Sequence, residues 1–156
     1  MSLESVQADL AVRAPDLAVM VTEDSTATVE LAAAVHGVAP GQIAKTLAIR
    51  VGDREFLLVT RGDARLSNQK AKVAFGGRPR MLGPEDVLRL TSHPVGGVCP
   101  FGLPAPLTIY CDVSLKIYGE VIPAGGSTHA SVRLPLGRLA ALCGNLWADA
   151  CDVPAS

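Results

Sequence analysis

"GQIAKTLAIRV", residues 41–51, alternates like a β-strand and carries one unexpected residue. Successive strand side chains point to opposite faces, so Lys45 shares a face with four large aliphatic residues, Ile43, Leu47, Ile49 and Val51. The opposite face carries a smaller and more polar set, Ala44, Thr46, Ala48 and Arg50. Because burying an ammonium without a partner is costly, a lysine that points toward core or pocket requires a specific role.

The neighbouring segments complete a mixed pattern. A turn at Gly52-Asp53 and a second strand, residues 55–61, predict a β-hairpin. We expect helices at residues 2–10, 28–36, 67–75, 84–90 and 136–147, and further strands at 17–21, 107–113, 120–126 and 129–134. Strands and helices without strict βαβ alternation predict an α+β fold with a mixed or antiparallel sheet.

Composition indicates one globular domain over residues 1–156. The chain is 49% hydrophobic, which argues against disorder, and no apolar run approaches the ~20 residues that span a bilayer. The first residues lack a basic segment followed by a long apolar core, so we expect no signal peptide, no membrane partner and a cytoplasmic location. The net charge of −1 argues against a globally basic nucleic-acid binder, and we expect no DNA partner.

The charge is nevertheless uneven. Residues 61–80 carry six cations and one acid, Asp63; the cations are Arg61, Arg65, Lys70, Lys72, Arg78 and Arg80. This basic strip is either a solvated face or a surface that touches a phosphate backbone.

The cysteines and the familiar cofactor motifs predict no metal and no cofactor. The four cysteines form no CxxC pair and no zinc-finger spacing, which favours free thiols in a reducing compartment. The glycine patterns of nucleotide-binding loops, HExxH and GxSxG are absent from the sequence. One alternative stays open: Cys99 as a thiol nucleophile, with His93 or His129 as its base.

Two glycine-rich segments are candidates for binding a substrate: "GGVCPFGL", residues 96–103, and "AGGSTHASVRL", residues 124–134. Gly96 and Gly97 permit close backbone approach to a ligand, and Pro100 and Pro104 stiffen the loop. Fixed amides of this kind can stabilise a developing oxyanion. The alternative is that both segments merely form turns.

Together these motifs resemble a known family. "HGV…GQIAKTL", "VTRGDARLS", "GGVCPFGL", "YCDVSL" and "AGGSTHASVRL", in this order and spacing, are similar to the YbaK/EbsC-type aminoacyl-tRNA deacylases. Those are relatives of the editing domain inserted in bacterial prolyl-tRNA synthetases. The resemblance covers residues 17–142 and implies a mixed, largely antiparallel curved sheet flanked by helices.

The resemblance also implies a function and its residues. It implies a free-standing hydrolase that cleaves the ester of a mischarged tRNA in trans, with a tRNA(Pro)-type or similar small-amino-acid mischarge as substrate, a tRNA acceptor end as partner and an aminoacyl-tRNA synthetase as a further partner. The lysine of the KTL element, here Lys45, is implied as the catalytic residue. The implied substrate-binding residues are Thr46, Gly96, Gly97, Cys99, Pro100, Gly126, His129 and Ser131.

Departures from the family pattern keep alternatives open. The segment around His129, "STHASVRL", differs from that of the synthetase inserts, so this histidine is either a helper or a strand-end residue. Lys45 either holds the phosphate or ribose of the acceptor end at the mouth of an apolar pocket, or packs its stem on Leu47 and extends its amine into water. Two other functions remain: a module that binds a tRNA end or a synthetase without hydrolysis, and a thiol hydrolase that uses Cys99.

Overall fold

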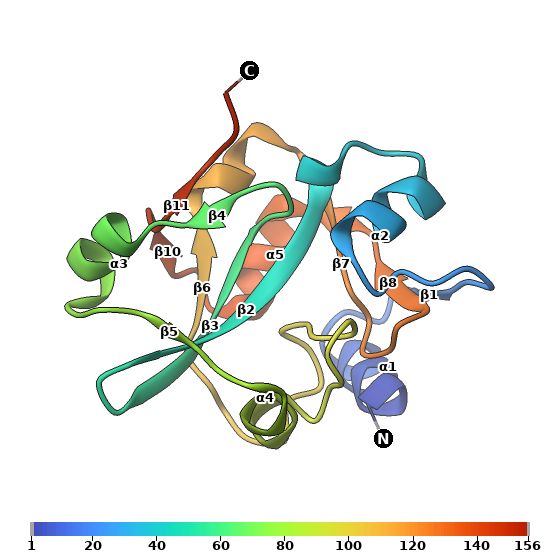
Figure 1. Cartoon of the computed structure of the whole chain (residues 1–156). Helices are drawn as coiled ribbons and strands as arrows, with labels where there is room; N and C mark the ends of the chain where they lie inside the picture. Colours follow the sequence, from blue (N-terminus) through green and yellow to red (C-terminus); the bar gives the residue numbers. More distant parts are fainter. Residues whose placement is uncertain (1, 156) are drawn as a thin grey trace.

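The computed structural model describes residues 2–155 and shows an α+β fold, as the sequence predicts. Five α-helices surround a strongly curled sheet in this range (Figure 1). The helices are α1 (Ser2–Arg13), α2 (Val29–His36), α3 (Asn68–Phe75), α4 (Pro84–Thr91) and α5 (Leu136–Cys143), with 3-10 turns η1 (Pro40–Gln42) and η2 (Val113–Ile117).

The central sheet is built around the predicted hairpin. Its strand order is β10-β6-β3-β2-β7-β9, and β5 also pairs with β2. These strands are β2 (Ile43–Val51), β3 (Arg54–Arg61), β5 (Arg80–Met81), β6 (Ile109–Asp112), β7 (Glu120–Pro123), β9 (Leu134–Pro135) and β10 (Trp147–Ala148). Two smaller pairs lie beside it, β1 (Val19–Val21) with β8 (Ala130–Val132) and β4 (Arg65–Leu66) with β11 (Cys151–Asp152).

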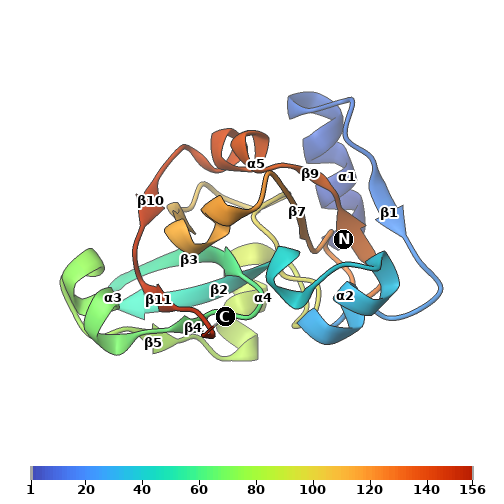
Figure 2. The ribbon, with the colours of Figure 1, turned by 90° about the horizontal axis from the view of Figure 1, so that it is seen from above.

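The central sheet is mixed, with three antiparallel and three parallel strand pairs, and the antiparallel pairs join more residues. The β2–β3 hairpin is antiparallel over Ala44–Val51, whereas β2 with β7, β3 with β6, and β6 with β10 are parallel. Seen from above, the sheet curls so that the strands enclose the core from several sides (Figure 2). This confirms the mixed, largely antiparallel curved sheet.

Local sequence signals begin and end the helices as expected. Thr28 caps α2 through a hydrogen bond from the N–H of Leu31, and Ser67 caps α3 in the same way. The predicted C-terminal helix is shorter than expected. Gly144 adopts a left-handed backbone with φ 102° and ends α5, so Trp147 lies in β10 instead.

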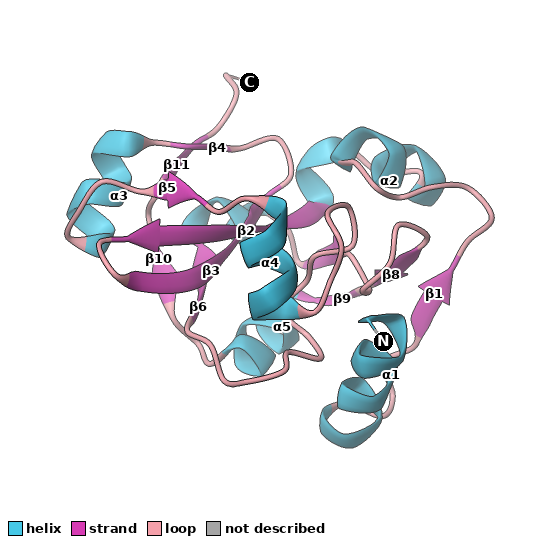
Figure 3. Cartoon of the chain, turned by 60° about the horizontal axis from the view of Figure 1, so that its bottom comes forward, coloured by secondary structure: helices cyan, strands magenta, loops and turns pink. Residues whose placement is uncertain are grey.

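Both faces of β2 are packed against buried clusters, and not only the face that carries the large aliphatic residues. The small residues Ala44 and Ala48 face the largest buried cluster, together with Leu57, Val59 and Phe101. The large residues Ile49 and Val51 belong to a second cluster under α3. Small side chains on β2 are required because α4 crosses this face of the strand (Figure 3).

The turn that joins β3 to β4 has no room for a side chain at Gly62. A Cβ on Gly62 would lie 2.2 Å from the carbonyl oxygen of Pro40 and 2.8 Å from that of Ile43. Both atoms belong to the backbone, so they cannot move aside easily. This close approach fixes the start of β2 against the turn.

We predict that Gly62→Ala destabilises the protein by about 2 kcal/mol, the usual scale of overpacking. The matched control is Gly137→Ala in α5, where nothing lies within 4 Å of the added Cβ. It should stabilise by about 0.5 kcal/mol because alanine has less conformational freedom to lose than glycine. Urea unfolding measures both; an unchanged midpoint for Gly62→Ala would contradict the packing described here.

Candidate functional site

A cavity that includes several predicted site residues lies at a gap in the sheet. On the side of β2 away from β3, β7 pairs only with Ile43 and Ala44, and β5 only with Ile49 and Arg50. Between these two strands the edge of β2 faces a cavity of about 280 Å³. The cavity is therefore built by the same strand that forms the centre of the fold.

The cavity wall is mostly apolar. Its apolar lining comes from β2, α2, α4 and the loop before Cys99, with Ile43, Ala44, Leu47, Ala48, Val87, Val95 and Val98 among the residues that contribute. The polar lining side chains are Thr26, Thr28, Lys45, Thr46 and Ser131. A small apolar group fits such a space, with a few polar groups to orient it.

Lys45 lies at the wall of this cavity with its amine turned toward the protein. The ammonium donates to the carbonyl oxygen of Ala64 at 2.5 Å. Partial burial lowers the pKa of the Lys45 amine, and the nearby charges of Asp63 and Glu30 offset only part of that effect. The amine is thus half-buried and held by a backbone carbonyl, so it does not extend freely into water.

Thr46 is the group whose hydrogen-bonding capacity is least used. Its Oγ1 atom is shielded from solvent and has no hydrogen-bond partner among the described residues. Its backbone also faces the gap: the carbonyl of Ala48 accepts from the N–H of Leu82 across that edge, and strand alternation points the Thr46 N–H and C=O the same way. Thr46 therefore presents a backbone amide at the open edge of β2, and its unpartnered hydroxyl is shielded from solvent.

The two glycine-rich segments pack against each other beside the cavity. Gly96, with φ 90°, lines it and packs on Ala27, whereas Gly97 sits behind. The Gly97 N–H donates to the carbonyl of Pro94, and the Gly126 N–H donates to the carbonyl of Gly97. Both amides thus have backbone partners in this structure, and Gly97 lies outside the cavity lining.

That close packing leaves no room for side chains. A Cβ on Gly97 would lie 2.8 Å from the backbone nitrogen of Ser127, and one on Gly126 would lie 2.7 Å from the carbonyl oxygen of Ser2. The hydroxyl of Ser2 also donates to the Gly126 carbonyl. The start of α1 thus supports the rear of both loops.

Cys99 is buried behind the cavity wall. It is fully buried, and burial raises the pKa of its thiol to about 12. His93, also fully buried, lies 3.5 Å away through its Nε2 atom, but that nitrogen is 2.6 Å from the carbonyl oxygen of Phe101. Burial lowers the pKa of His93. A neutral thiol out of reach of substrate does not suit the nucleophile hypothesis.

Two other expected residues lie away from the cavity. Pro100 lines a separate groove with residues of α1 and α5. His129 is outside the cavity lining; its carbonyl accepts from the N–H of Thr22, and its own N–H donates to the hydroxyl of Ser127. Of the nine predicted site residues, the structure brings Lys45, Thr46, Gly96 and Ser131 together at the cavity.

Two lining residues were missed by the sequence analysis. Thr26 and Thr28 reach the cavity from the segment that begins α2. The helix cap at Thr28 is visible in sequence, but its proximity to Lys45 depends on the chain crossing from α2 to β2. Only the fold supplies that information.

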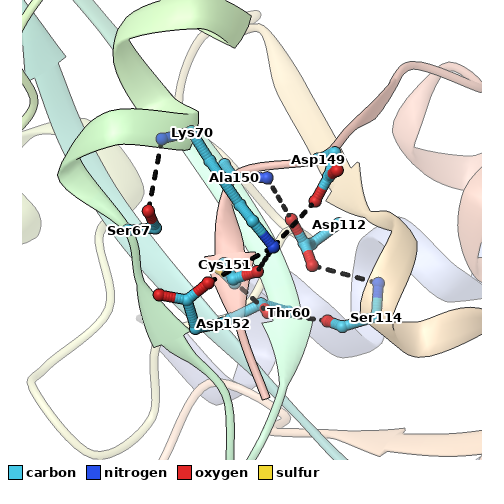
Figure 4. A network of polar contacts seen from close by, with 9 residues as sticks. All are labelled: Thr60, Ser67, Lys70, Asp112, Ser114, Asp149, Ala150, Cys151 and Asp152. Carbon is cyan, nitrogen blue, oxygen red and sulfur yellow. Dashed lines mark hydrogen bonds and ion pairs between the residues drawn. The ribbon is translucent and has the colours of Figure 1, made fainter.

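The basic strip is divided by ion pairs. Arg61 is paired with Asp63. Lys70 reaches the carboxylates of Asp149 and Asp152 and the carbonyl of Cys151, as Figure 4 shows. Asp112 in the same network accepts from two backbone amides and ties the C-terminal segment to the sheet (Figure 4). The strip is therefore not one continuous cationic face.

Residues 2–155 contain neither a candidate metal site nor a helix that could span a membrane. No group of three or more His, Cys, Asp or Glu side chains in that range is arranged to hold a metal ion. No helix in the same range has the length and apolar character to cross a bilayer.

Comparison with known proteins identifies the family. Residues 23–142 match the model of the aminoacyl-tRNA editing domain. This chain belongs to that family. The match confirms the resemblance inferred from the KTL element and the glycine-rich loops.

Individual relatives agree with this membership. The chain is 42% identical to the uncharacterized protein YwhH of Bacillus subtilis (strain 168) over 153 residues, covering 97% of this chain and 98% of that protein. It is 29% identical over 99 residues to the proline–tRNA ligase of Desulfitobacterium hafniense, covering 62% of this chain and 17% of the ligase. The ligase thus contains a related segment within a much longer protein.

A solved structure shows the same fold. The crystal structure of a candidate trans-editing enzyme for prolyl-tRNA synthetase superposes with a TM-score of 0.89 at 37% identity, covering 97% of each chain.

We predict that stability depends on pH through Lys45. A lysine whose pKa is lowered in the folded state binds fewer protons there than in the unfolded chain, so folding is favoured as the pH rises toward 10.5. The stability of the natural protein relative to Lys45→Met should therefore increase over that range. Urea unfolding of both proteins at several alkaline pH values measures it; a constant difference would contradict the burial of this amine.

We also predict that Cys99 resists alkylation in the folded protein. At mildly alkaline pH a buried thiol with a pKa of about 12 contains almost no thiolate. Mass spectrometry after iodoacetamide treatment should show Cys99 unmodified until denaturant is added. Rapid labelling of the native protein at this residue would restore the nucleophile hypothesis.

Proposed function

We propose that the protein is a free-standing aminoacyl-tRNA deacylase that hydrolyses the ester of a mischarged tRNA in trans. The observation that carries the proposal is the cavity at the open edge of β2, with Lys45 and Thr46 on its wall. Membership of the editing-domain family and the similarity to a candidate trans-editing enzyme for prolyl-tRNA synthetase support it.

The cavity suits a small aminoacyl group. At about 280 Å³ and with mostly aliphatic walls, it admits a small apolar side chain. Differences of a methyl group in such a pocket are worth only about 1–3 kcal/mol, so size alone gives modest discrimination. The hydroxyls of Thr28 and Ser131 add polar contacts for the amino group or the ester.

The reaction requires little acid–base machinery. An aminoacyl ester is already activated, and the neighbouring ribose hydroxyl can position or activate a water molecule. In this proposal the amide of Thr46 donates to the ester oxygen as negative charge develops, an interaction that typically lowers a barrier by about 3 kcal/mol. The shielded hydroxyl of Thr46 turns toward the bound substrate to add a second donor. Lys45 holds the phosphate or ribose of the acceptor end by exchanging the Ala64 carbonyl for the substrate.

A panel of mischarged tRNAs tests the proposal. We expect hydrolysis of at least one small aminoacyl ester, and a loss of about tenfold or more in kcat/KM on Lys45→Ala, which removes a positioning charge. Thr46→Val should lower kcat by about tenfold or more because it removes a hydroxyl donor and keeps the shape, whereas Thr46→Ser should retain most activity.

Lys72→Ala on the exposed face of α3 is the matched control and should behave like the natural protein. Binding of mischarged tRNA without turnover by the natural protein would instead support a non-catalytic binding module. Full activity of Lys45→Ala would refute the assigned role of this lysine.

A further inference from the structure

Five arginines gather at the end of the hairpin where β5 joins β2. Arg50 and Arg54 come from the hairpin, Arg78 and Arg80 from the segment through β5, and Arg89 from α4. Two of these, Arg78 and Arg80, belong to the basic strip of residues 61–80. The structure instead places Arg80 opposite Arg50, which lies outside that strip.

Two like charges face each other across this strand pair. Arg50 and Arg80 are direct partners in the antiparallel register, so their side chains leave the same face of the sheet. Like charges at directly opposed positions destabilise a sheet. Glu55 offsets the charge of Arg50, whereas Arg80 has no such partner among the described residues.

The nearby carboxylates pair with Arg50 and Arg89, and not with Arg78 or Arg80. Glu55 accepts from both Arg50 and Arg89, and Asp86 also accepts from Arg89. Arg54 donates to the carbonyl of Phe75. Within residues 2–155, neither Arg78 nor Arg80 has an ion pair, and both are exposed.

The intervening proline gives Arg78 and Arg80 a common direction. Pro79 is buried and anchors the segment, and a residue before proline favours extended backbone. Arg78 and Arg80 are two positions apart in such a segment, so they project to the same side. The sequence Arg-Pro-Arg thus presents two guanidinium groups from a fixed base.

This pair leads directly to the cavity. Met81 and Leu82, the next two residues, line the cavity, and Met81 pairs with Ile49 of β2. An anion held by Arg78 and Arg80 would lie beside the mouth through which the aminoacyl ester enters. Guanidinium groups bind phosphate oxygens through paired hydrogen bonds, which suits a nucleic-acid backbone.

We propose that Arg78 and Arg80 bind backbone phosphates of the RNA strand whose 3′ end enters the cavity. The proposal rests on the proposed function and adds the path of the acceptor strand: it runs along β5, past Met81, to Lys45 and Thr46. Arg50 is paired with Glu55, so the free positive charge of this path comes from Arg78 and Arg80.

Binding of uncharged tRNA tests this path without any need for turnover. Fluorescence anisotropy should show about a tenfold weaker Kd for the double variant Arg78→Gln/Arg80→Gln at moderate salt. The slope of log K against log salt should fall by about 0.7–0.9 for each arginine removed, because each phosphate contact releases a counterion. Lys72→Gln, an exposed cation on α3, is the control and should change neither quantity. Equal binding by the double variant and the control would overturn the proposal.

Two further substrates locate the contact. A tRNA trimmed of its 3′-terminal nucleotides should bind the natural protein and the double variant with equal affinity. A continued difference in affinity would mean that the arginines contact another part of the tRNA, which would refute the stated path. An aminoacyl ester of adenosine alone, which lacks upstream phosphates, should be hydrolysed equally by both. If the natural protein hydrolyses no ester but the binding results hold, the deacylase proposal fails and the phosphate path stands.

Discussion

The organising constraint of this protein is a strand that is paired continuously on one side and interrupted on the other. β2 pairs with β3 along its length, so it is rigid, yet between β7 and β5 it leaves a short edge without a strand partner. Unpaired backbone groups at such an edge are costly when buried and available when a ligand can meet them. The cavity lies at this interruption, which makes the centre of the fold also the wall of the site.

The elements around the gap serve this arrangement. α2 and α4 cover the two ends of the opening, and the paired glycine-rich loops close its far side through backbone contacts that tolerate no added Cβ. Burial of His93 and Cys99 behind the loop gives it a packed support. His93 and Cys99 have side chains of the kind that catalyse reactions, but here they support the loop. Thr46 and the half-buried Lys45 instead lie at the cavity wall.

This division suits the proposed hydrolysis of an ester, which requires few acid–base groups. Rigid placement of the substrate and a preorganised donor supply most of what an activated ester needs. The charges at the rim complement that site: Lys45 lies inside its wall and the arginines of β5 lie just outside it. A polyanionic substrate that ends in a small acyl group has the shape and charge distribution that such an arrangement accommodates.

Local sequence determined much of the structure. Alternation predicted the β2–β3 hairpin, and Thr28 and Ser67 predicted the starts of α2 and α3, because these signals depend on neighbours along the chain. The order of the motifs predicted the family. Tertiary structure alone decided which residues meet at the cavity. It placed Gly97, Cys99, Pro100, Gly126 and His129 outside the lining and brought in Thr26 and Thr28. It also paired Arg80 with Arg50, because strand register and loop packing join positions that no sequence spacing relates.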